Sequence, residues 1–273
     1  MNPRKREAMT AANFIRGLCP WLNESVTPIG LVLGTGWDVI KDEEATEIPF
    51  EHIPGFHGLE HIDGHARKLL VGKIAGKHVV ALRGRVHMNE APCDPNIPRM
   101  VRLQTEMLFQ LGVKQIIVTS AVGSLRDFVK VGTVVIIDGF ITIYAPEMPL
   151  WANEFYSPED MISERLSFIA HRAKHEQEGI TSLTEVAHVM VRGPFFEGRK
   201  YDKALLAASG AKVVGMSMLP EACIAAIYGA EFLGLGFVTN SPFEVHSHEV
   251  NVERAKEISE KLSDYLTRII KMI

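Results

Sequence analysis

The chain has 273 residues, of which 47% are hydrophobic and 23% charged, and its formal net charge is −4. This length is enough for one large α/β domain or two small ones, and the composition is ordinary for a globular protein. A mildly negative chain without a basic tail argues against a nucleic-acid partner held mainly through its phosphates. No apolar run reaches the roughly 20 residues that span a bilayer, so a membrane partner is not expected either.

The three cysteines, Cys19, Cys93 and Cys223, are odd in number and far apart. They form neither a disulfide framework nor a CxxC site, so we expect a reducing, cytoplasmic location. The first 22 residues begin with basic side chains but contain no continuous apolar stretch. A secretory signal peptide is therefore not expected.

Runs rich in Val, Ile and Leu predict strands, and several lack alternation, as strands covered on both faces do. In chain order these predicted strands are 29–33, 69–74, 78–82, 115–119, 133–137, 186–191 and 233–239. Gly76-Lys77 is expected to turn a hairpin between the second and the third. Apolar residues at helical spacing predict helices at 99–111, 161–178, 199–209, 220–228 and 248–270.

Strands and helices thus alternate, and no internal repeat or long polar linker divides the chain. This pattern predicts a single α/β domain over residues 1–273, with a twisted, mixed, mostly parallel sheet flanked by helices. The least regular connection is 144–158, which contains proline and tryptophan. Such loops often carry sites or contacts.

Two glycine-rich stretches invite a nucleotide-binding interpretation. In "GLVLGTGWD" a strand is followed by Gly34-Thr35-Gly36, where a tight turn and the Thr35 hydroxyl suit an oxyanion. Val39 stands where the third glycine of a dinucleotide fingerprint belongs, so that fingerprint is absent. "GKIAGK" at 72–77 is one residue short of a P-loop and lacks its Ser or Thr. A plain strand-to-helix turn remains the alternative for Gly34-Thr35-Gly36.

Two other stretches concentrate basic side chains and histidines. In "ALRGRVHMNEAP", Arg85 and His87 follow a predicted strand, either as solvated decoration or as an anion site. In "HGLEHIDGH", His57, His61 and His65 recur at every fourth residue, a spacing that shares one face only on a helix. The glycines and proline around them argue against a helix, so a metal site is not expected.

Polar residues also follow the later strands. "GMSMLPEA" predicts a helix start with Ser217 as N-cap, and a helix N-terminus favours anions, although a purely structural cap is the commoner use. Glu197 follows "RGPFF", and Asn240 follows "FLGLGFVT". Taken singly, a glutamate is usually solvated and an asparagine usually forms a turn.

These residues share a position just after predicted strands, where open α/β sheets bind their ligands. We therefore expect them to converge on one cleft. Its anion half would comprise Thr35, Arg85, His87 and Ser217. Its neutral, hydrogen-bonding half would comprise Phe196, Glu197, Met216 and Asn240. An oxyanion beside a flat polar ring describes a phosphate next to a nucleobase.

Six ordered blocks carry a resemblance to a known family: "LGTG", "GHARKLLVGKIAGKHVVALRGRVHMNE", "VTSAVGSL", "RGPFFE", "GAKVVGMSMLPEACIAAIYG" and "GLGFVTN". Together they resemble the trimeric purine nucleoside phosphorylases and the related methylthioadenosine phosphorylases, from about residue 29 to 266. The resemblance implies the nucleoside phosphorylase fold and a pentosyl transfer. Inorganic phosphate and a purine nucleoside would give free base and α-ribose 1-phosphate.

Motif matching extends the resemblance to single residues. It implies phosphate binding by Thr35, His65, Arg85, His87, Ala121 and Ser217. It implies purine binding by Phe196, Glu197, Val214 and Asn240, and ribose binding by Met216 and His248. Among these, it gives Asn240, Glu197 and His87 the catalytic roles. It also implies a homotrimer that needs no metal and no organic cofactor.

The chain departs from the family pattern at several places. Asn89 replaces a common tyrosine, Ser120 a common asparagine, and Arg67 the glycine after "GHA". The connection 144–158 and the segment between Asn240 and His248 are both shorter than usual. These departures concern ribose recognition and closure of the site.

Three functions fit these observations. The first is phosphorolysis of the 6-oxopurine nucleosides inosine and guanosine, because Glu197 and Asn240 suit a 6-oxopurine edge. The second is phosphorolysis of methylthioadenosine or methylthioinosine, where the position of Asn240 is typically aspartate. The third is a protein that binds a nucleoside or phosphate without turnover. Inosine with and without phosphate would separate them.

Overall fold

The computed structural model describes residues 3–23, 25–37, 45–59, 66–91, 93–150, 153–155, 157, 161–175, 180–193 and 195–273. Its helices are α1 (Pro3–Leu18), α2 (Asn96–Gln110), α3 (Glu164–His175), α4 (Asp202–Ala208), α5 (Leu219–Ile227), α6 (His248–Glu257) and α7 (Ser259–Met272). Its strands are β1 (Ile29–Leu33), β2 (Thr46–Pro49), β3 (Lys68–Ile74), β4 (Lys77–Arg83), β5 (Gln115–Ser124), β6 (Thr133–Ile141), β7 (Thr181–Met190), β8 (Val213–Gly215) and β9 (Glu231–Asn240). A short 3₁₀ helix, Phe50–His52, follows β2.

The predicted mixed sheet flanked by helices is confirmed. Its strand order is β2-β3-β4-β1-β5-β8-β7-β6-β9, and β5 also pairs with β9. The parallel pairs are β1 with β4, β1 with β5, β5 with β9, β6 with β7 and β7 with β8. The β5–β9 pairing closes five strands into a ring, which the expectation of an open sheet did not include.

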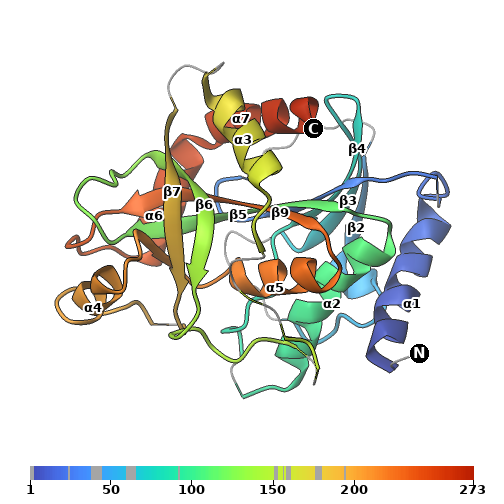
Figure 1. Ribbon diagram of the computed structural model, residues 1–273. Coiled ribbons are helices and arrows are strands. Elements are labelled where there is room, and N and C mark those ends of the chain that lie inside the picture. Colours follow the sequence, from blue (N-terminus) through green and yellow to red (C-terminus); the bar gives the residue numbers. More distant parts are fainter. Residues whose placement is uncertain are drawn as a thin grey trace.

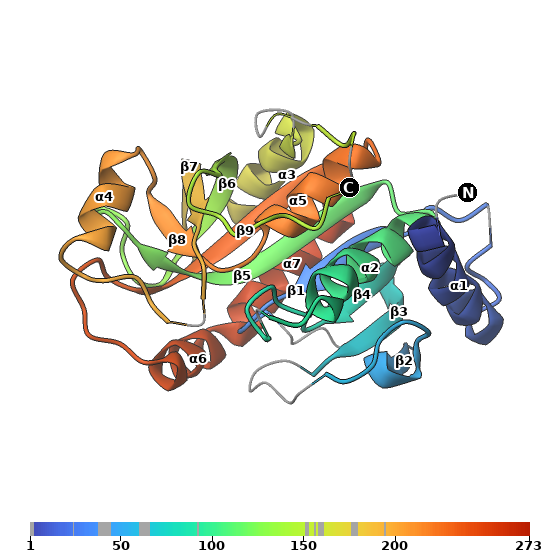
Figure 2. The same ribbon diagram turned by 90° about the horizontal axis from the view of Figure 1, so that it is seen from below.

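Helices cover both faces of the sheet (Figure 1). Apolar residues of α1, α2 and α5 form one core with one face, and α3 and α7 form a second core with the other. Strand β1 is apolar throughout because it contributes to both cores. Val32 joins the first core, while Leu31 and Leu33 join the second. Figure 2 shows α4 at the end of the molecule opposite α1, where Leu206 packs against Val189 and Val214.

Two local expectations were wrong. The predicted helix 248–270 is two helices, because Ile258 leaves the helical conformation (φ −110°, ψ 3°). The Ser259 hydroxyl donates to the carbonyl oxygen of Lys256 at this break. The β3–β4 hairpin turns at Ala75 and Gly76, which have φ of 50° and 80°, rather than at Gly76-Lys77. Helix α1 and strands β2 and β8 were not predicted.

The irregular connection after β6 is held by one buried arginine. Arg102 of α2 donates to both carboxylate oxygens of Glu154 at 2.6 and 2.9 Å and to the carbonyl oxygen of Pro149 at 3.0 Å. It also pairs with Glu106 one helical turn away, at 2.7 Å. Because breaking a buried ion pair is strongly unfavourable, these contacts fix the connection against α2. Among the described residues, none of the helices is both long and apolar enough to cross a membrane.

Candidate active site

A cavity of about 430 Å³ opens beside β5, where that strand changes partners. Along one edge, β1 pairs with β5 as far as Val118, and β8 takes over at Gly123. The intervening residues Ser120, Ala121 and Val122 line the cavity. The site therefore lies in the gap between the end of β1 and the beginning of the ring.

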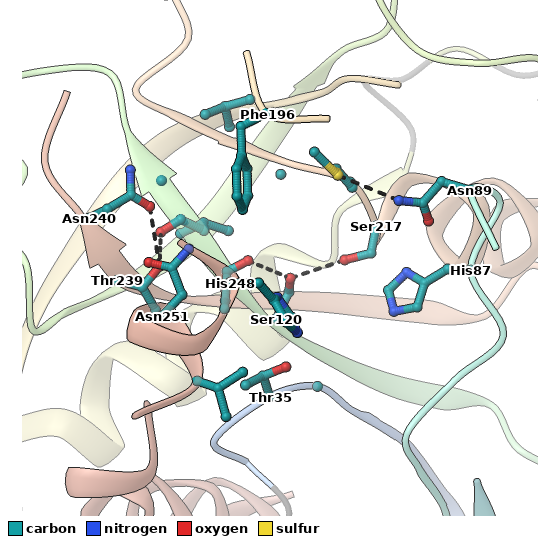
Figure 3. A pocket seen from close by; sticks show the side chains of 18 of the residues that line it. Thr35, His87, Asn89, Ser120, Phe196, Ser217, Thr239, Asn240, His248 and Asn251 are labelled. Carbon is teal, nitrogen blue, oxygen red and sulfur yellow. Dashed lines mark hydrogen bonds between the residues drawn. The ribbon is translucent and has the colours of Figure 1, made fainter. Parts of the chain in front are cut away.

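This cavity collects the residues singled out from the sequence. Eleven of the twelve predicted site residues line it: Thr35, Arg85, His87, Ala121, Phe196, Glu197, Val214, Met216, Ser217, Asn240 and His248. The twelfth, His65, lies outside the described residues. In Figure 3, Ser217 and His87 lie on one side of the cavity, Asn240 and Thr239 lie on the other, and Phe196 lies between them.

Hydroxyl groups form the centre of the anion half. The hydroxyl oxygens of Ser120 and Ser217 are 3.0 Å apart, and Ser120 also donates to the carbonyl oxygen of Ala121 at 2.8 Å (Figure 3). The expectation that Ser217 caps α5 was wrong, because Met218 is the N-cap and its φ is 75°. Ser217 therefore faces the cavity rather than the helix end. Ser120, which stands where the family commonly has asparagine, thus supplies the hydroxyl partner of Ser217.

The backbone at the end of β1 approaches β5 closely. The amide nitrogen of Gly34 donates to the Thr119 hydroxyl at 3.0 Å. A Cβ at position 34 would lie 2.6 Å from the carbonyl oxygen of Thr119, so only glycine fits. This contact brings Thr35 to the edge of the cavity.

Arg85 lines the cavity but is only 1% exposed. Its guanidinium donates to Glu221 of α5 at 3.0 Å, and to the carbonyl oxygens of Thr119 and Val32. Burial lowers the pKa of Arg85, and the carboxylate of Glu221 opposes that shift. The charge is thus held in place by the protein at the floor of the site.

The backbone between Arg85 and His87 is fixed from α2. The Gln104 side chain accepts from the amide nitrogen of Val86 at 2.8 Å and donates to its carbonyl oxygen at 3.0 Å. The amide nitrogen of His87 donates to Glu90 at 2.7 Å. Arg85 and His87, the two predicted anion-binding residues, therefore project from a backbone segment that these hydrogen bonds hold in place.

Arg67, a departure from the family glycine, has a structural explanation. Its φ is 48°, a conformation that favours glycine, so the backbone geometry of a glycine is kept. Its guanidinium pairs with Glu90 at 2.8 Å, and both side chains are largely buried. Glu90 in turn accepts from His87. The Arg67 side chain thus stabilises Glu90, which in turn holds the backbone of His87 in the anion half.

On the opposite side, Asn240 ends β9. Its amide oxygen accepts from the Thr239 hydroxyl at 3.3 Å, and its amide nitrogen donates to the carbonyl oxygen of Ser241 at 3.4 Å. A Cβ at position 123 would lie 3.0 Å from this amide nitrogen, so Gly123 makes room for the side chain. Asn240 is 2% exposed, and its amide brings both a donor and an acceptor group to the cavity wall.

Glu197 lines the same half and has a buried cationic neighbour. The Lys203 ammonium lies 3.5 Å from its carboxylate. Phe196 packs against the His246 ring, with ring centroids 4.6 Å apart. His246, Asn89 and Asn251 line the cavity although the sequence analysis assigned them no role. The repeated histidines of "VHSH" were the only available signal for His246.

The shortened segment before His248 is tied down at three points. Arg254 of α6 donates to Glu244 at 2.6 Å and to the carbonyl oxygen of Thr239 at 2.7 Å. The amide nitrogen of Ser241 donates to Glu244 at 3.1 Å. The hydrogen bonds that Glu244 accepts, led by the one from Arg254, lower its pKa to about 2. The segment is short but still brings His248 to the cavity wall.

Asn89, where the family commonly has tyrosine, meets Met216 across the ribose side of the predicted site. The Asn89 amide nitrogen lies 3.5 Å from the Met216 sulfur (Figure 3). A Cβ at position 193 would lie 2.1 Å from that nitrogen, so Gly193 leaves space for the contact. A second cavity of about 350 Å³ lies on the far side of these two side chains.

The chemistry of the cavity is divided. One half offers hydroxyl groups, an imidazole and a buried guanidinium, which suit a multiply charged oxyanion. The other half offers a carboxylate, an amide and an aromatic ring, which suit a flat polar heterocycle. Within the described residues, no three His, Cys, Asp or Glu side chains gather as metal ligands would.

The chain is similar to known proteins over nearly its whole length. A profile of the phosphorylase superfamily matches residues 28–272. Purine nucleoside phosphorylase 1 of Geobacillus stearothermophilus is 28% identical over 271 residues, covering 96% of this chain and 94% of its own. Purine nucleoside phosphorylase of Mycobacterium tuberculosis is 31% identical over 215 residues, covering 78% and 75%.

Solved structures show the same fold. The structure of Schistosoma mansoni purine nucleoside phosphorylase in complex with inosine has a TM-score of 0.82 and 26% sequence identity to this chain. It covers 98% of this chain and 96% of its own. The two folds therefore match over nearly the whole of both chains.

Proposed function

Since the chain belongs to the phosphorylase superfamily, we propose that it is a purine nucleoside phosphorylase that acts on 6-oxopurine nucleosides. Inosine or guanosine and inorganic phosphate would be converted reversibly into the free base and α-ribose 1-phosphate. One observation carries the proposal: residues from five separate strand ends and turns line a single cavity with an anion half and a base half.

Phosphate occupies the anion half in this proposal. Thr35, Ser217 and His87 donate hydrogen bonds to its oxygens, and the buried Arg85 supplies fixed positive charge. His65 and Ala121 complete the set by motif matching. This places a phosphate oxygen beneath the anomeric carbon of a ribose that rests against Met216 and His248. Holding the two reactants in one geometry removes much of the entropic barrier of a bimolecular step.

The reaction breaks the bond between the anomeric carbon and the purine nitrogen and forms a bond from that carbon to a phosphate oxygen. As the first bond loosens, positive charge develops on the ribose and negative charge on the purine. The phosphate stabilises the cation and then attacks it. Asn240 hydrogen-bonds the purine where negative charge collects, and a donor aimed at such charge can contribute about 3–4 kcal/mol.

The base half favours a 6-oxopurine. An ionised Glu197 only accepts hydrogen bonds, and hypoxanthine and guanine present an N–H at the edge it would face. Adenine presents a bare ring nitrogen there. Asn240 can donate to a 6-oxo group through its amide. Phe196 and Val214 would contact the ring faces, since both line the same half of the cavity.

A panel of four nucleosides tests this proposal. Purified protein is given phosphate with inosine, guanosine, adenosine or methylthioadenosine, and free base and sugar phosphate are quantified. We expect efficient turnover of the first two and very weak turnover of adenosine. Preference for adenosine or methylthioadenosine would assign the protein to the methylthio branch. Binding of a nucleoside without turnover would leave it a binding protein.

We also propose a homotrimer in a reducing, cytoplasmic compartment. The connection after β6 supports the first part, because it exposes Ile143 and Phe155, at 78% and 88%, on a segment that Arg102 holds in place. All three cysteines are free, which supports the second. Light scattering at working concentration is expected to give three times the 30.3 kDa of one chain. The mass of a single chain would exclude the trimer.

A further inference from the structure

A lysine is buried directly behind the base half of the cavity. Lys203, near the start of α4, is 2% exposed, and its ammonium lies 3.5 Å from the carboxylate of Glu197. Among the described residues, this ammonium has no hydrogen-bond acceptor. A buried lysine is costly unless a negative charge compensates it. The carboxylate of Glu197 is the negative charge that compensates the buried ammonium of Lys203.

The backbone between the two residues is closed into a tight turn. The amide nitrogen of Lys203 donates to the carbonyl oxygen of Gly198 at 3.0 Å. The amide nitrogen of Gly198 donates in turn to the carboxylate of Asp202 at 2.8 Å. A Cβ at position 198 would lie 3.1 Å from that carboxylate, so the turn has little space for a larger residue. Glu197 and Lys203 thus have a fixed mutual geometry.

Other charged or titratable side chains also lie near Glu197. His246 interacts electrostatically with both Glu197 and Lys203, and with Glu244 and Arg254 beyond it. Burial first, and Lys203 second, lower the pKa of His246, which favours the neutral ring. Asp202 uses a carboxylate oxygen on the turn itself. Lys203 is therefore the cation in direct contact with Glu197, and the neighbouring histidine does not replace it.

We propose that Lys203 is a positioning residue that holds the Glu197 carboxylate in place at the cavity wall, and so sets the preference for purines that present an N–H to it. This inference rests on the proposed function. An ionised carboxylate beside an ammonium accepts hydrogen bonds only. Without the ammonium, this largely buried carboxylate loses the charge that compensates its burial and fixes its position, so its hydrogen bond to a purine N–H is weakened.

The test compares Lys203→Met with Lys203→Arg, which keeps the charge, and with Lys200→Met, which removes an exposed lysine of the same turn. For each protein, kcat/KM is measured with inosine and with adenosine across pH. In Lys203→Met the inosine-to-adenosine ratio of kcat/KM is expected to fall about tenfold or more. This is the effect of losing one hydrogen bond between the Glu197 carboxylate and the purine N–H. Lys203→Arg should keep most of the wild-type ratio, and Lys200→Met all of it.

A double-mutant cycle separates action through Glu197 from general damage. In a Glu197→Gln background, which has no carboxylate to pair with the ammonium, adding Lys203→Met is expected to leave the ratio unchanged. A Lys203→Met ratio equal to wild type at every pH would overturn the inference, as would an equal further loss in the Glu197→Gln background. Thermal unfolding and circular dichroism check that each variant is folded.

Failure of the proposed function would be visible in the wild-type protein alone, as absence of phosphate-dependent turnover. In that case the same variants are compared by calorimetric binding of hypoxanthine and adenine. A Lys203→Met variant that loses its preference for hypoxanthine supports the inference. An unchanged preference, or a wild type that prefers adenine, contradicts it.

Discussion

The hydroxyl oxygens of Ser120 and Ser217 lie 3.0 Å apart and join β5 to the turn that precedes α5. This contact bridges the gap in the sheet where the cavity opens, and it holds the Ser217 hydroxyl at the cavity wall. Because Met218 rather than Ser217 caps α5, the hydroxyl is available to a ligand. The pair is thus a support for the anion half and a point at which it can be tested.

Replacing Ser217 by alanine is expected to raise KM for phosphate and leave KM for inosine nearly unchanged. A hydrogen bond to a charged group contributes about 1.5–3 kcal/mol, which corresponds to an increase of about 10- to 100-fold in KM for phosphate. Initial rates over a grid of both substrates measure the two constants. Ser209→Ala is the matched control, since its hydroxyl donates to Leu206 on α4, outside the cavity. An unchanged phosphate KM in a folded Ser217→Ala protein would remove Ser217 from the site.

Arg85→Ala is expected to raise KM for phosphate far more than KM for the nucleoside, and also to destabilise the fold. The substitution leaves Glu221 buried without its cation, which typically costs about 3–5 kcal/mol. Urea denaturation gives the free energy of unfolding. Arg165→Ala is the control, because its pair with Glu231 is exposed and such pairs contribute at most about 1 kcal/mol.

A second substitution separates the two effects of Arg85. Adding Glu221→Leu to Arg85→Ala removes the unpaired carboxylate and is expected to recover part of the lost stability. The phosphate KM should stay raised, because the guanidinium is still absent. Recovery of phosphate binding together with stability would mean that Arg85 acts only on the fold.

Asn240→Asp is expected to shift preference from inosine toward adenosine. A carboxyl at this position can accept from the 6-amino group of adenine, whereas the amide donates to a 6-oxo group. Buried hydrogen-bonding sites can discriminate by up to about 10⁴- to 10⁵-fold, so the ratio of kcat/KM values has a wide range in which to move. Asn96→Asp, at an exposed position, controls for the added charge. If the variant keeps the wild-type ratio, Asn240 does not read position 6.

The free energy of unfolding is expected to decrease as the pH falls below 6.5, because of His188. Burial lowers the pKa of this fully buried ring from 6.5 to about 3. The unfolded chain therefore binds a proton in this window that the folded chain does not, so unfolding is favoured as pH falls. One such proton corresponds to about 1.4 kcal/mol per pH unit.

The free energy of unfolding at several pH values between 6.5 and 5 measures this effect. His188→Leu is expected to flatten the dependence, although the variant itself is less well packed against Phe140. His52→Leu, at an exposed position, controls for the loss of a histidine. An equal slope in His188→Leu and wild type would assign the dependence to other groups. Below pH 4.5, Glu231 and Glu244 add to the loss, because their pKa values are lowered to about 2 in the folded state.

The sequence predicted the elements whose signal is local. Strand β1 has the predicted bounds because five consecutive apolar residues are buried on both faces. Strand β5 is five residues longer than predicted, because small residues such as Ala121 and Gly123 carry no strand signal there. The break at Ile258 also escaped prediction, since the apolar stripe continues through it from Ala255 to Leu262.

The site was predictable as a set of residues but not as a set of interactions. The strand ends indicated where Ser217, Glu197 and Asn240 would meet. Nothing in the spacing indicates that Arg85 pairs with Glu221, 136 positions away. The β5–β9 closure that gives the cavity its far wall likewise depends on the packing of the whole chain. Ion pairs and ring closure are long-range properties, and a pattern along one chain does not contain them.

The dependence of inosine cleavage on phosphate tests the central proposal most directly. Hypoxanthine release is followed in phosphate-free buffer and at increasing phosphate, and ribose 1-phosphate is quantified in the same samples. We predict no release without phosphate, saturable release with it, and one ribose 1-phosphate for each hypoxanthine. Release of hypoxanthine at the same rate without phosphate, or of free ribose in place of the sugar phosphate, would contradict the assignment of the cavity to phosphorolysis.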